Sequence, residues 1–128
     1  MDFKNITEGL SNTLETSVNE KDTAATYGSG LLEVYATPAM IAFMENTSLH
    51  VVQNKLPEGY NTVGTSVNIK HLKATPVGMK VTCKAKLISV NGSKLEFDLE
   101  CHDEKGLIGK GTHKRYIINT EEFIKGLK

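Results

Sequence analysis

The sequence predicts a single α+β domain over residues 1–128, in which an antiparallel sheet curls around one long central helix. One segment carries apolar residues at helical spacing nearly all round its axis, as a buried helix does. Four later segments alternate apolar and polar residues and are rich in β-branched side chains, as strands are. Short turns join these four segments, which favours an antiparallel meander. A chain of 128 residues is long enough to bury the core of one such domain.

The N-terminal part of the chain carries the weakest pattern. Alternation over Leu14–Val18 predicts a strand, and Tyr27–Gly30 is typical of a turn. The helix is predicted to begin at Thr37, a good N-cap, with Pro38 in the first helical position. It is predicted to end near Lys55, just ahead of the next proline. Because its apolar residues lie on most sides, we expect this helix to be buried nearly all round.

The meander is predicted at 60–72, 79–90, 94–103 and 107–119, followed by a short helical tail over 121–127. The loop Asn91-Gly92-Ser93 has an odd length and places a glycine where a left-handed bulge residue is needed. An odd loop brings the two apolar faces together, so Leu87 pairs with Phe97 and Cys83 with Cys101. We expect the two cysteines to be reduced and buried side by side.

Composition excludes several classes of function. Fifteen basic and fifteen acidic residues cancel, which argues against binding to nucleic acid or to an anionic membrane. No segment approaches the roughly 20 apolar residues of a membrane span, and the N-terminus lacks a secretory pattern. We therefore expect a soluble, cytoplasmic protein. The cysteines and histidines show no metal-ligand spacing, so we expect neither a metal nor an organic cofactor.

Four residues at the edges of the predicted helix and of the first meander strand are candidates for chemistry: Thr37, Glu45, Gly64 and His71. The period of two along the strand puts His71 on the apolar, inward face, together with Val63, Thr65, Val67 and Ile69. Helical geometry puts Glu45 on the shoulder of the buried stripe. A carboxylate and an imidazole in an apolar site shift each other's pKa and can serve as a base or nucleophile with its partner. The backbone amide of Gly64 is a candidate donor to an oxyanion.

Each candidate also has a purely structural interpretation. Thr37 is explained by the N-cap, Glu45 by an ion pair with a lysine, His71 by a hydrogen-bonded core position and Gly64 by a β-bulge. A structural role is also favoured for His113. Thr37 and Glu45 are separated by a rise of about 12 Å along one helix, which favours completion of the site by a second subunit.

The joint occurrence of these features resembles the hotdog-fold thioesterases of the fluoroacetyl-CoA thioesterase type. The resemblance covers roughly residues 31–124. It is carried by the segment Tyr35-Ala36-Thr37-Pro38-Ala39-Met40, by Glu45, Val63-Gly64-Thr65 and His71, by Ala74-Thr75-Pro76-Val77-Gly78, and by Ile108-Gly109-Lys110-Gly111-Thr112-His113-Lys114-Arg115.

The resemblance implies a catalytic set of Thr37, Glu45 and His71, with Gly64 beside the thioester oxygen of the substrate. It also implies a homodimer, or a dimer of dimers, with active sites at the subunit interface. One region departs from the family. The segment that should form an aromatic lid, Thr23 to Leu32, is small, polar and glycine-containing. Selectivity for the fluoroacetyl group is therefore not expected.

The resulting expectation is hydrolysis of a short acyl-CoA thioester to the free acid and CoA. Glu45 either activates water or attacks the carbonyl, while His71 holds and moves protons and Thr37 orients the substrate or the carboxylate. Two other functions are compatible with the same fold and candidate residues. One is a hotdog hydratase or dehydratase acting on acyl thioesters, and the other is a non-catalytic acyl-CoA-binding module. CoA and carrier-protein thioesters are not distinguished by the sequence.

Overall fold

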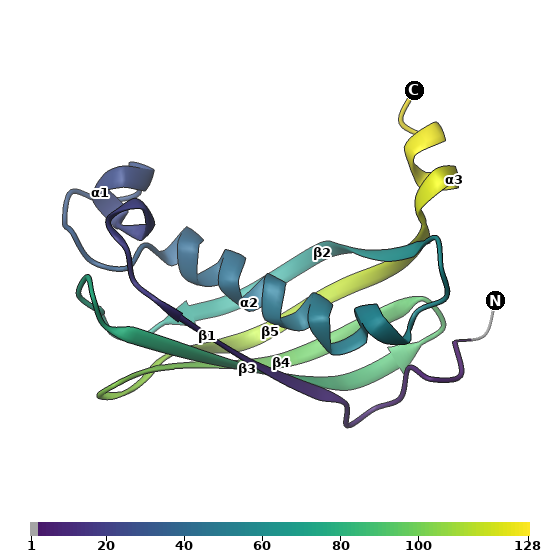
Figure 1. The fold of residues 1–128 in the computed structure, drawn as a ribbon, viewed down its shortest axis with the longest axis horizontal. Helices are drawn as coiled ribbons and strands as arrows, with labels where there is room; N and C mark the ends of the chain where they lie inside the picture. Colours follow the sequence, from purple (N-terminus) through teal and green to yellow (C-terminus); the bar gives the residue numbers. More distant parts are fainter. Residues whose placement is uncertain (1–2) are drawn as a thin grey trace.

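A computed structural model describes residues 3–128 of the chain as one long helix against a five-stranded antiparallel sheet (Figure 1). This arrangement confirms the predicted α+β architecture. The elements in chain order are β1 (Ser11–Ser17), a 3₁₀ turn (Glu20–Asp22), α1 (Ala24–Tyr27), α2 (Thr37–Val52), a second 3₁₀ turn (Gln53–Lys55), β2 (Tyr60–His71), β3 (Lys80–Asn91), β4 (Lys94–Asp103), β5 (Gly106–Asn119) and α3 (Thr120–Lys125). The strands lie in the order β1-β3-β4-β5-β2, so β1 and β2 form the two edges.

The core lies between α2 and the sheet. Alternate residues of β3 and β4 point toward the helix and are fully buried, because the pleat sends successive side chains to opposite faces. From the helix, Met40, Met44 and Val52 meet them with no exposed surface. The aromatic centre of this core is Phe97 of β4, which is also fully buried.

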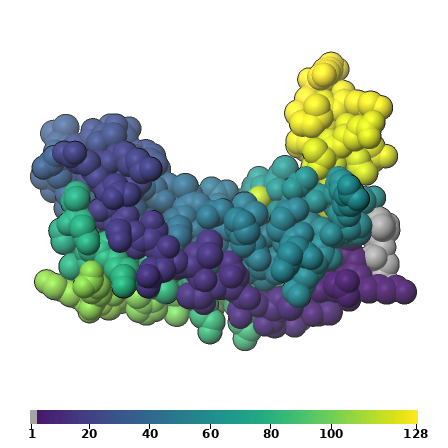
Figure 2. Space-filling view, in the orientation of Figure 1, coloured from purple at the N-terminus to yellow at the C-terminus, as the bar shows by residue number. Residues whose placement is uncertain are grey.

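The helix is not buried all round, contrary to the sequence-based expectation. Its sheet-facing side is covered, but Ala42 is exposed and Ile41 and Leu49 are half-buried. Figure 2 shows this outer side of α2 as the floor of a saddle between the α1 segment and the upright α3. Apolar residues around a helix predict burial, but within this chain the sheet covers only one side of α2.

The hairpin between β3 and β4 has the predicted register. Cys83 pairs with Cys101 and Leu87 pairs with Phe97, and Gly92 in the connecting turn has a φ of 62°. Both cysteines are free thiols without exposed surface. The odd loop length was sufficient to fix this register, because any other alignment would expose one apolar face.

Strand β2 differs from the simple alternation that the sequence indicates. Its pairing with β5 shifts between Gly64 and Ser66, so a β-bulge interrupts the period of two at Thr65. Gly64 lies opposite Arg115 and Val67 opposite His113, two residues of β5 that are buried on the helix side. The prediction that Val63 and Thr65 share the inward face with His71 is therefore wrong. Gly64 takes that side, ahead of the bulge.

No helix within residues 3–128 is long and apolar enough to cross a membrane.

Candidate active site

The start of α2 brings Thr37 to the end of β2. Ala36 is the N-cap residue of α2. Thr37, which the sequence predicted as the N-cap, is the first helical residue, and Pro38 follows it in the first turn. The N-cap prediction for Thr37 is therefore wrong by one position. As a result its hydroxyl does not cap the helix, and Thr37 Oγ1 lies 2.7 Å from His71 Nδ1. These two residues, 34 positions apart in the sequence, form a direct hydrogen bond at the edge of the sheet.

The His71 ring is suited to act as a base. Burial lowers its pKa below the ordinary histidine value, and the backbone of Lys73 opposes that effect only in part. The ring is therefore neutral at neutral pH, and one nitrogen is free to accept a proton. His71 Nε2 is buried and has no hydrogen-bond partner among residues 3–128. The edge of the Tyr35 ring also contacts the imidazole, with ring centroids 6.5 Å apart.

A cavity of about 370 Å³ opens beside this hydrogen-bonded pair. It is bounded by the α1 segment, the start of α2 and the loop after β2, and its lining is Ala24, Ser29, Val34, Tyr35, Thr37, His71, Leu72, Lys73 and Ala74. The lining is mixed, with apolar walls, the hydroxyl groups of Ser29, Tyr35 and Thr37, one imidazole and one ammonium group. Such a cavity can hold a small uncharged group next to a reactive hydroxyl and an anionic group near Lys73.

Glu45 lies in a second polar cluster, two turns further along α2. Its Oε2 atom is 3.9 Å from His113 Nε2 and 4.0 Å from Arg115 Nη1, both on β5. The Glu45 side chain is 39% exposed, whereas those of His113 and Arg115 are 0% and 7% exposed. The carboxylate therefore reaches down from the helix to two nitrogen groups that are built into the sheet.

Arg115 is anchored by several hydrogen bonds. Its Nε donates to Thr62 Oγ1 over 2.8 Å, Nη2 to the Thr62 carbonyl over 2.9 Å and Nη1 to His113 Nε2 over 3.1 Å. Burial lowers the pKa of the guanidinium, and the nearby Glu45 carboxylate opposes this shift. A buried guanidinium with this many acceptors is fixed in position as well as in charge.

Gly64 faces the centre of the Glu45 cluster. A Cβ atom at this position would lie 2.8 Å from Glu45 Oε2, 3.2 Å from His113 Cε1 and 3.4 Å from Arg115 Nη1. All three groups thus lie close to the strand at this position, and no room is left there for a side chain. The structural interpretation of Gly64 as a bulge position is confirmed, and the close approach to Glu45 adds a second reason for glycine.

The four predicted residues therefore divide into two pairs. Thr37 contacts His71, while Gly64 adjoins Glu45. Within residues 3–128, the basic side chains within 4.0 Å of the Glu45 carboxylate are those of His113 and Arg115 and do not include His71.

The sequence interpretation favoured a structural role for His113 but did not place it beside Glu45, and it gave Arg115 no role of its own. The available signal was the alternation along β5, which places His113, Arg115 and Ile117 on one buried face. A histidine and an arginine in register with a core isoleucine need buried polar partners, and a carboxylate on the facing helix is one such partner.

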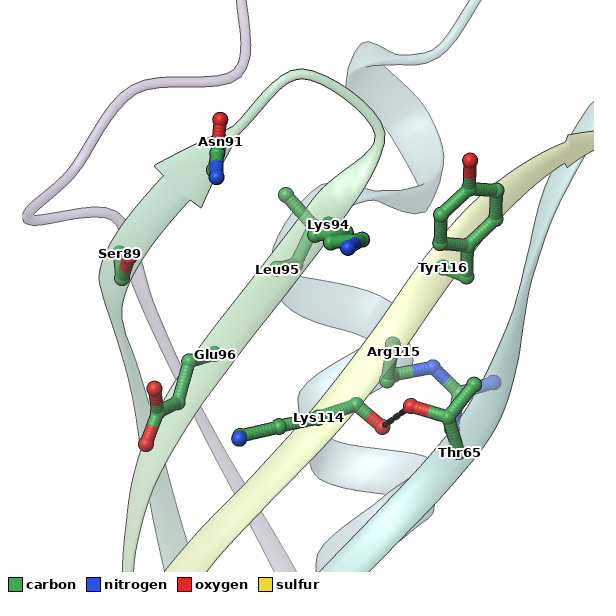
Figure 3. Close-up of a pocket in the computed structure, with 9 residues that line it drawn as sticks. All are labelled: Thr65, Ser89, Asn91, Lys94, Leu95, Glu96, Lys114, Arg115 and Tyr116. Carbon is green, nitrogen blue, oxygen red and sulfur yellow. Dashed lines mark hydrogen bonds between the residues drawn. The ribbon is translucent and has the colours of Figure 1, made fainter.

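A larger hollow of about 470 Å³ lies elsewhere, on the sheet face opposite α2. Figure 3 shows Lys114 and Tyr116 projecting into view over this hollow, while the side chain of Arg115 turns away behind the strand. None of the four predicted residues lines this hollow. The bulge residue Thr65 does, and its hydroxyl donates a hydrogen bond to the Lys114 carbonyl. Size alone does not identify the site, because the reactive groups lie on the other face.

Within residues 3–128, no three His, Cys, Asp or Glu side chains gather closely enough to hold a metal ion. The polar groups of the two clusters along α2 are a hydroxyl (Thr37), two imidazoles (His71 and His113), a carboxylate (Glu45) and a guanidinium (Arg115). These are groups for proton transfer, nucleophilic attack and stabilisation of negative charge.

The long helix on a curved antiparallel sheet, with polar residues at the junction of α2 and β2, defines a protein of the hotdog-fold thioesterase class. The fold agrees with solved structures. The fluoroacetyl-CoA thioesterase FlK matches with a TM-score of 0.90 at 31% identity, covering 95% of each chain. A hot-dog-like protein from Thermanaerovibrio acidaminovorans matches with a TM-score of 0.90 at 24% identity, over 99% of this chain and 95% of that one, which supports the fold alone.

Residues 18–121 match the model of the fluoroacetyl-CoA-specific thioesterase family, and the chain belongs to that family. The fluoroacetyl-CoA thioesterase of Streptantibioticus cattleyicolor is 38% identical over 91 residues, which are 71% of this chain. The matched segment spans 66% of that relative's own length, just under two thirds. Structures of FlK variants hold fluoroacetate with CoA in one case and acetyl-CoA in another.

Proposed function

We propose that the protein hydrolyses a small acyl-CoA thioester to the free acid and CoA. The observation that carries this proposal is the 2.7 Å hydrogen bond between the Thr37 hydroxyl and His71 Nδ1, beside an open cavity, in a chain of a thioesterase family. A hydroxyl bonded to a neutral imidazole is the arrangement that nucleophilic acyl transfer requires. Thr37, Glu45 and His71, with Gly64, form the proposed site.

In the proposed first step, Thr37 Oγ1 attacks the thioester carbonyl while His71 Nδ1 accepts the hydroxyl proton. The C–S bond then breaks, and the CoA sulfur leaves with the proton that the imidazole returns. In the second step, water attacks the acyl-threonine ester and gives a proton to His71, after which the C–O bond breaks and Thr37 regains its hydroxyl proton. The neutral state of His71 supports this role, because a protonated ring accepts no proton.

Glu45 is proposed to act from the other side of the substrate. It begins about 12 Å further along the helix axis than Thr37, so an extended substrate or water molecule must connect the two groups. Gly64 lies against the Glu45 carboxylate and near the Arg115 guanidinium. The carboxylate is 39% exposed, and on its exposed side it can orient polar atoms of the substrate or the attacking water. The Gly64 amide remains the candidate donor to an oxyanion.

We propose a homodimer as the working form. Strand β2 is an edge strand of 12 residues with β5 on one side only, and long edges of this kind favour pairing. On the helix side of β2, Val67 is 46% exposed, and Ala42 on the outer side of α2 is exposed as well. A second copy that pairs along β2 would cover these apolar side chains and close the site over Glu45. A further association of two dimers is not required by these surfaces.

The proposed substrate is an acyl-CoA with a short acyl group. Homologous FlK variants bind acetyl-CoA, and fluoroacetate with CoA, which supports ligands of this size. Residues 23–32, before α2, hold the short α1 and a glycine turn with Tyr27 as their one aromatic residue, so they do not form an aromatic-rich lid. We therefore propose an acyl range that is not restricted to the fluorinated group. The ammonium of Lys73, at the cavity, is a candidate partner for a CoA phosphate.

The test is release of free thiol from acetyl-, fluoroacetyl-, propionyl-, branched and aromatic acyl-CoAs. Wild type is compared with His71→Ala and Glu45→Ala, and with His102→Ala as a control on an exposed histidine. Hydrolysis of at least one ester by wild type and the control, with loss in the other two variants, is the expected result. No thiol release, with acyl-CoA still raising the melting temperature, would replace the proposal by a binding module. Water addition to an enoyl-CoA without thiol release would replace it by a hydratase.

A further inference from the structure

We propose that His113 is a positioning residue for the Glu45 part of the site: it holds Arg115 Nη1 away from the Glu45 carboxylate and so leaves that carboxylate without a direct ion pair. This inference rests on the proposed function for its kinetic consequence. Its structural basis is the chain of contacts from the Ser66 carbonyl through His113 to Arg115.

The first step is the protonation state of His113. Its Nδ1 lies 2.8 Å from the Ser66 carbonyl oxygen, which only accepts, so Nδ1 carries a proton. Its Nε2 lies 3.1 Å from Arg115 Nη1, and a guanidinium only donates, so Nε2 carries none. Both hydrogen bonds are satisfied by a single form of the ring, which is the neutral tautomer with its proton on Nδ1.

The surroundings keep the ring in that form. His113 is almost fully buried, and its ring packs against Phe97 with centroids 6.4 Å apart. Burial has the largest effect on the pKa of His113 and lowers it; the hydrogen bond to the Ser66 carbonyl opposes this, the Arg115 charge lowers the pKa further, and Glu45 raises it with the smallest effect. A proton on Nε2 would face the guanidinium at 3.1 Å, whereas the Glu45 carboxylate is farther away, at 3.9 Å.

The second step concerns which nitrogen of Arg115 is bonded to His113. Arg115 Nη1 is the nitrogen that His113 accepts from, and the same nitrogen is the one nearest to Glu45 Oε2, at 4.0 Å. Nε and Nη2 are bound to Thr62 and point elsewhere. A free guanidinium and carboxylate would close to a direct ion pair at less than about 3 Å. Nη1 carries two N–H groups, but its bond to His113 Nε2 fixes where the nitrogen lies, so His113 holds the two charged groups 4.0 Å apart.

The third step is the state of the carboxylate that this separation preserves. Gly64 lets the carboxylate lie close against β2, because a Cβ there would lie 2.8 Å from Glu45 Oε2. The Glu45 side chain is still 39% exposed on its other side. If Nη1 moved onto the carboxylate, a direct ion pair would engage its oxygens. His113 thus leaves the carboxylate of Glu45 available to a bound molecule, although it does not contact that molecule itself.

The chain offers a matched pair of substitutions for the test. In His113→Gln the amide oxygen reaches the position of Nε2 and can still accept from Arg115. In His113→Asn the shorter amide reaches only the position of Nδ1, so the bond to Ser66 is retained and the acceptor for Arg115 is lost. Both variants lose the ring and its contact with Phe97, so a purely structural role would affect them alike.

We expect His113→Asn to lower kcat/KM about tenfold, through a raised KM, as one lost hydrogen bond would. We expect His113→Gln to stay within about threefold of wild type at a similar melting temperature. Equal losses in the two variants, or a larger loss in His113→Gln, would overturn the inference.

A spectroscopic measurement on the wild type decides the first step without reference to activity. In protein carrying ¹⁵N-labelled histidine, the His113 ring at neutral pH should give a protonated Nδ1 and an unprotonated Nε2. A proton on Nε2 overturns the inference even if the enzyme is active. If wild type releases no thiol, the proposed function fails by itself. The spectrum and the relative acyl-CoA affinities of His113→Gln and His113→Asn then decide the role of His113.

Discussion

The two polar centres along α2 differ in how fully their atoms are bonded. At the start of the helix, Thr37 and His71 share one hydrogen bond, and His71 Nε2 has no partner within residues 3–128. Two turns later, His113 and Arg115 are bonded to backbone and side-chain oxygens and to each other. A sparsely bonded pair can exchange a proton, whereas a saturated cluster holds its geometry. The first centre is thus suited to chemistry and the second to positioning.

The largest expected effect is on turnover at the first centre. His71→Asn retains a side-chain oxygen that can accept from Thr37, but an amide cannot take up the proton. We expect kcat to fall at least about a hundredfold, as for loss of a general base. The unfolding midpoint should change little, since the His71 side chain makes a single hydrogen bond within the part of the chain that the structure describes, residues 3–128. A variant that keeps most of its turnover would show that His71 serves only to orient Thr37.

At the second centre, the largest effect is expected on stability. Arg115→Met leaves the Thr62 carbonyl, the Thr62 hydroxyl and His113 Nε2 without their donor in a buried setting. We expect the free energy of unfolding, measured in urea, to fall by about 3 kcal/mol. Lys114→Met, at the exposed neighbouring position, is the control and should change it by less than about 0.5 kcal/mol. Equal values for the two variants would contradict a structural role for the cluster.

Gly64→Ala tests whether the position of the Glu45 carboxylate matters for activity. The added methyl would lie 2.8 Å from Glu45 Oε2, the end of a flexible side chain that can move aside. We therefore expect a folded protein with kcat/KM lowered about tenfold, as for one displaced polar group. Gly126→Ala, whose methyl would meet nothing closer than 3.4 Å, is the matched control. Unchanged kinetics in Gly64→Ala would mean that the carboxylate needs no fixed position.

The smallest expected effect is on pH dependence. The histidines of both centres contribute to the pH dependence of stability, whereas that of kcat/KM reports the first centre. The pKa values of His71 and His113 are lowered by burial, so each ring binds a proton more readily in the unfolded chain. Stability should therefore fall as the pH drops below about 6.5, the unfolded value, and continue to fall down to the folded pKa. The acid limb of kcat/KM, which reports His71, should have its midpoint below about 6.5. A midpoint above that value would contradict a neutral, buried base.

Much of the fold follows from local patterns in the sequence. The alternation in β3 and β4, with the odd turn around Gly92, was enough to fix the pairing of Cys83 with Cys101. The bounds of α2 also followed from its caps, to within one residue at the start. The predicted all-round burial of α2 did not follow, because apolar residues on its outer side need a surface that this chain alone does not provide.

Less of the site could be predicted, and for physical reasons. A bulge shifts the alternation of β2 by one residue, and nothing in the sequence around Gly64 distinguishes a bulge from a close approach. The pairing of Thr37 with His71 depends on where the end of β2 meets α2, which is a tertiary property. Arg115 was overlooked because arginine usually lies at the surface, while here it is paired inside.

A double-mutant cycle on Thr37 and His71 tests the central claim most directly. Single and double alanine variants are compared by kcat on the best acyl-CoA substrate of the wild type. Residues that act as one unit give non-additive losses, so the double variant should be no slower than His71→Ala alone. Losses that multiply in the double variant would mean that the two residues act independently, and would contradict a hydroxyl–imidazole pair as the reacting centre.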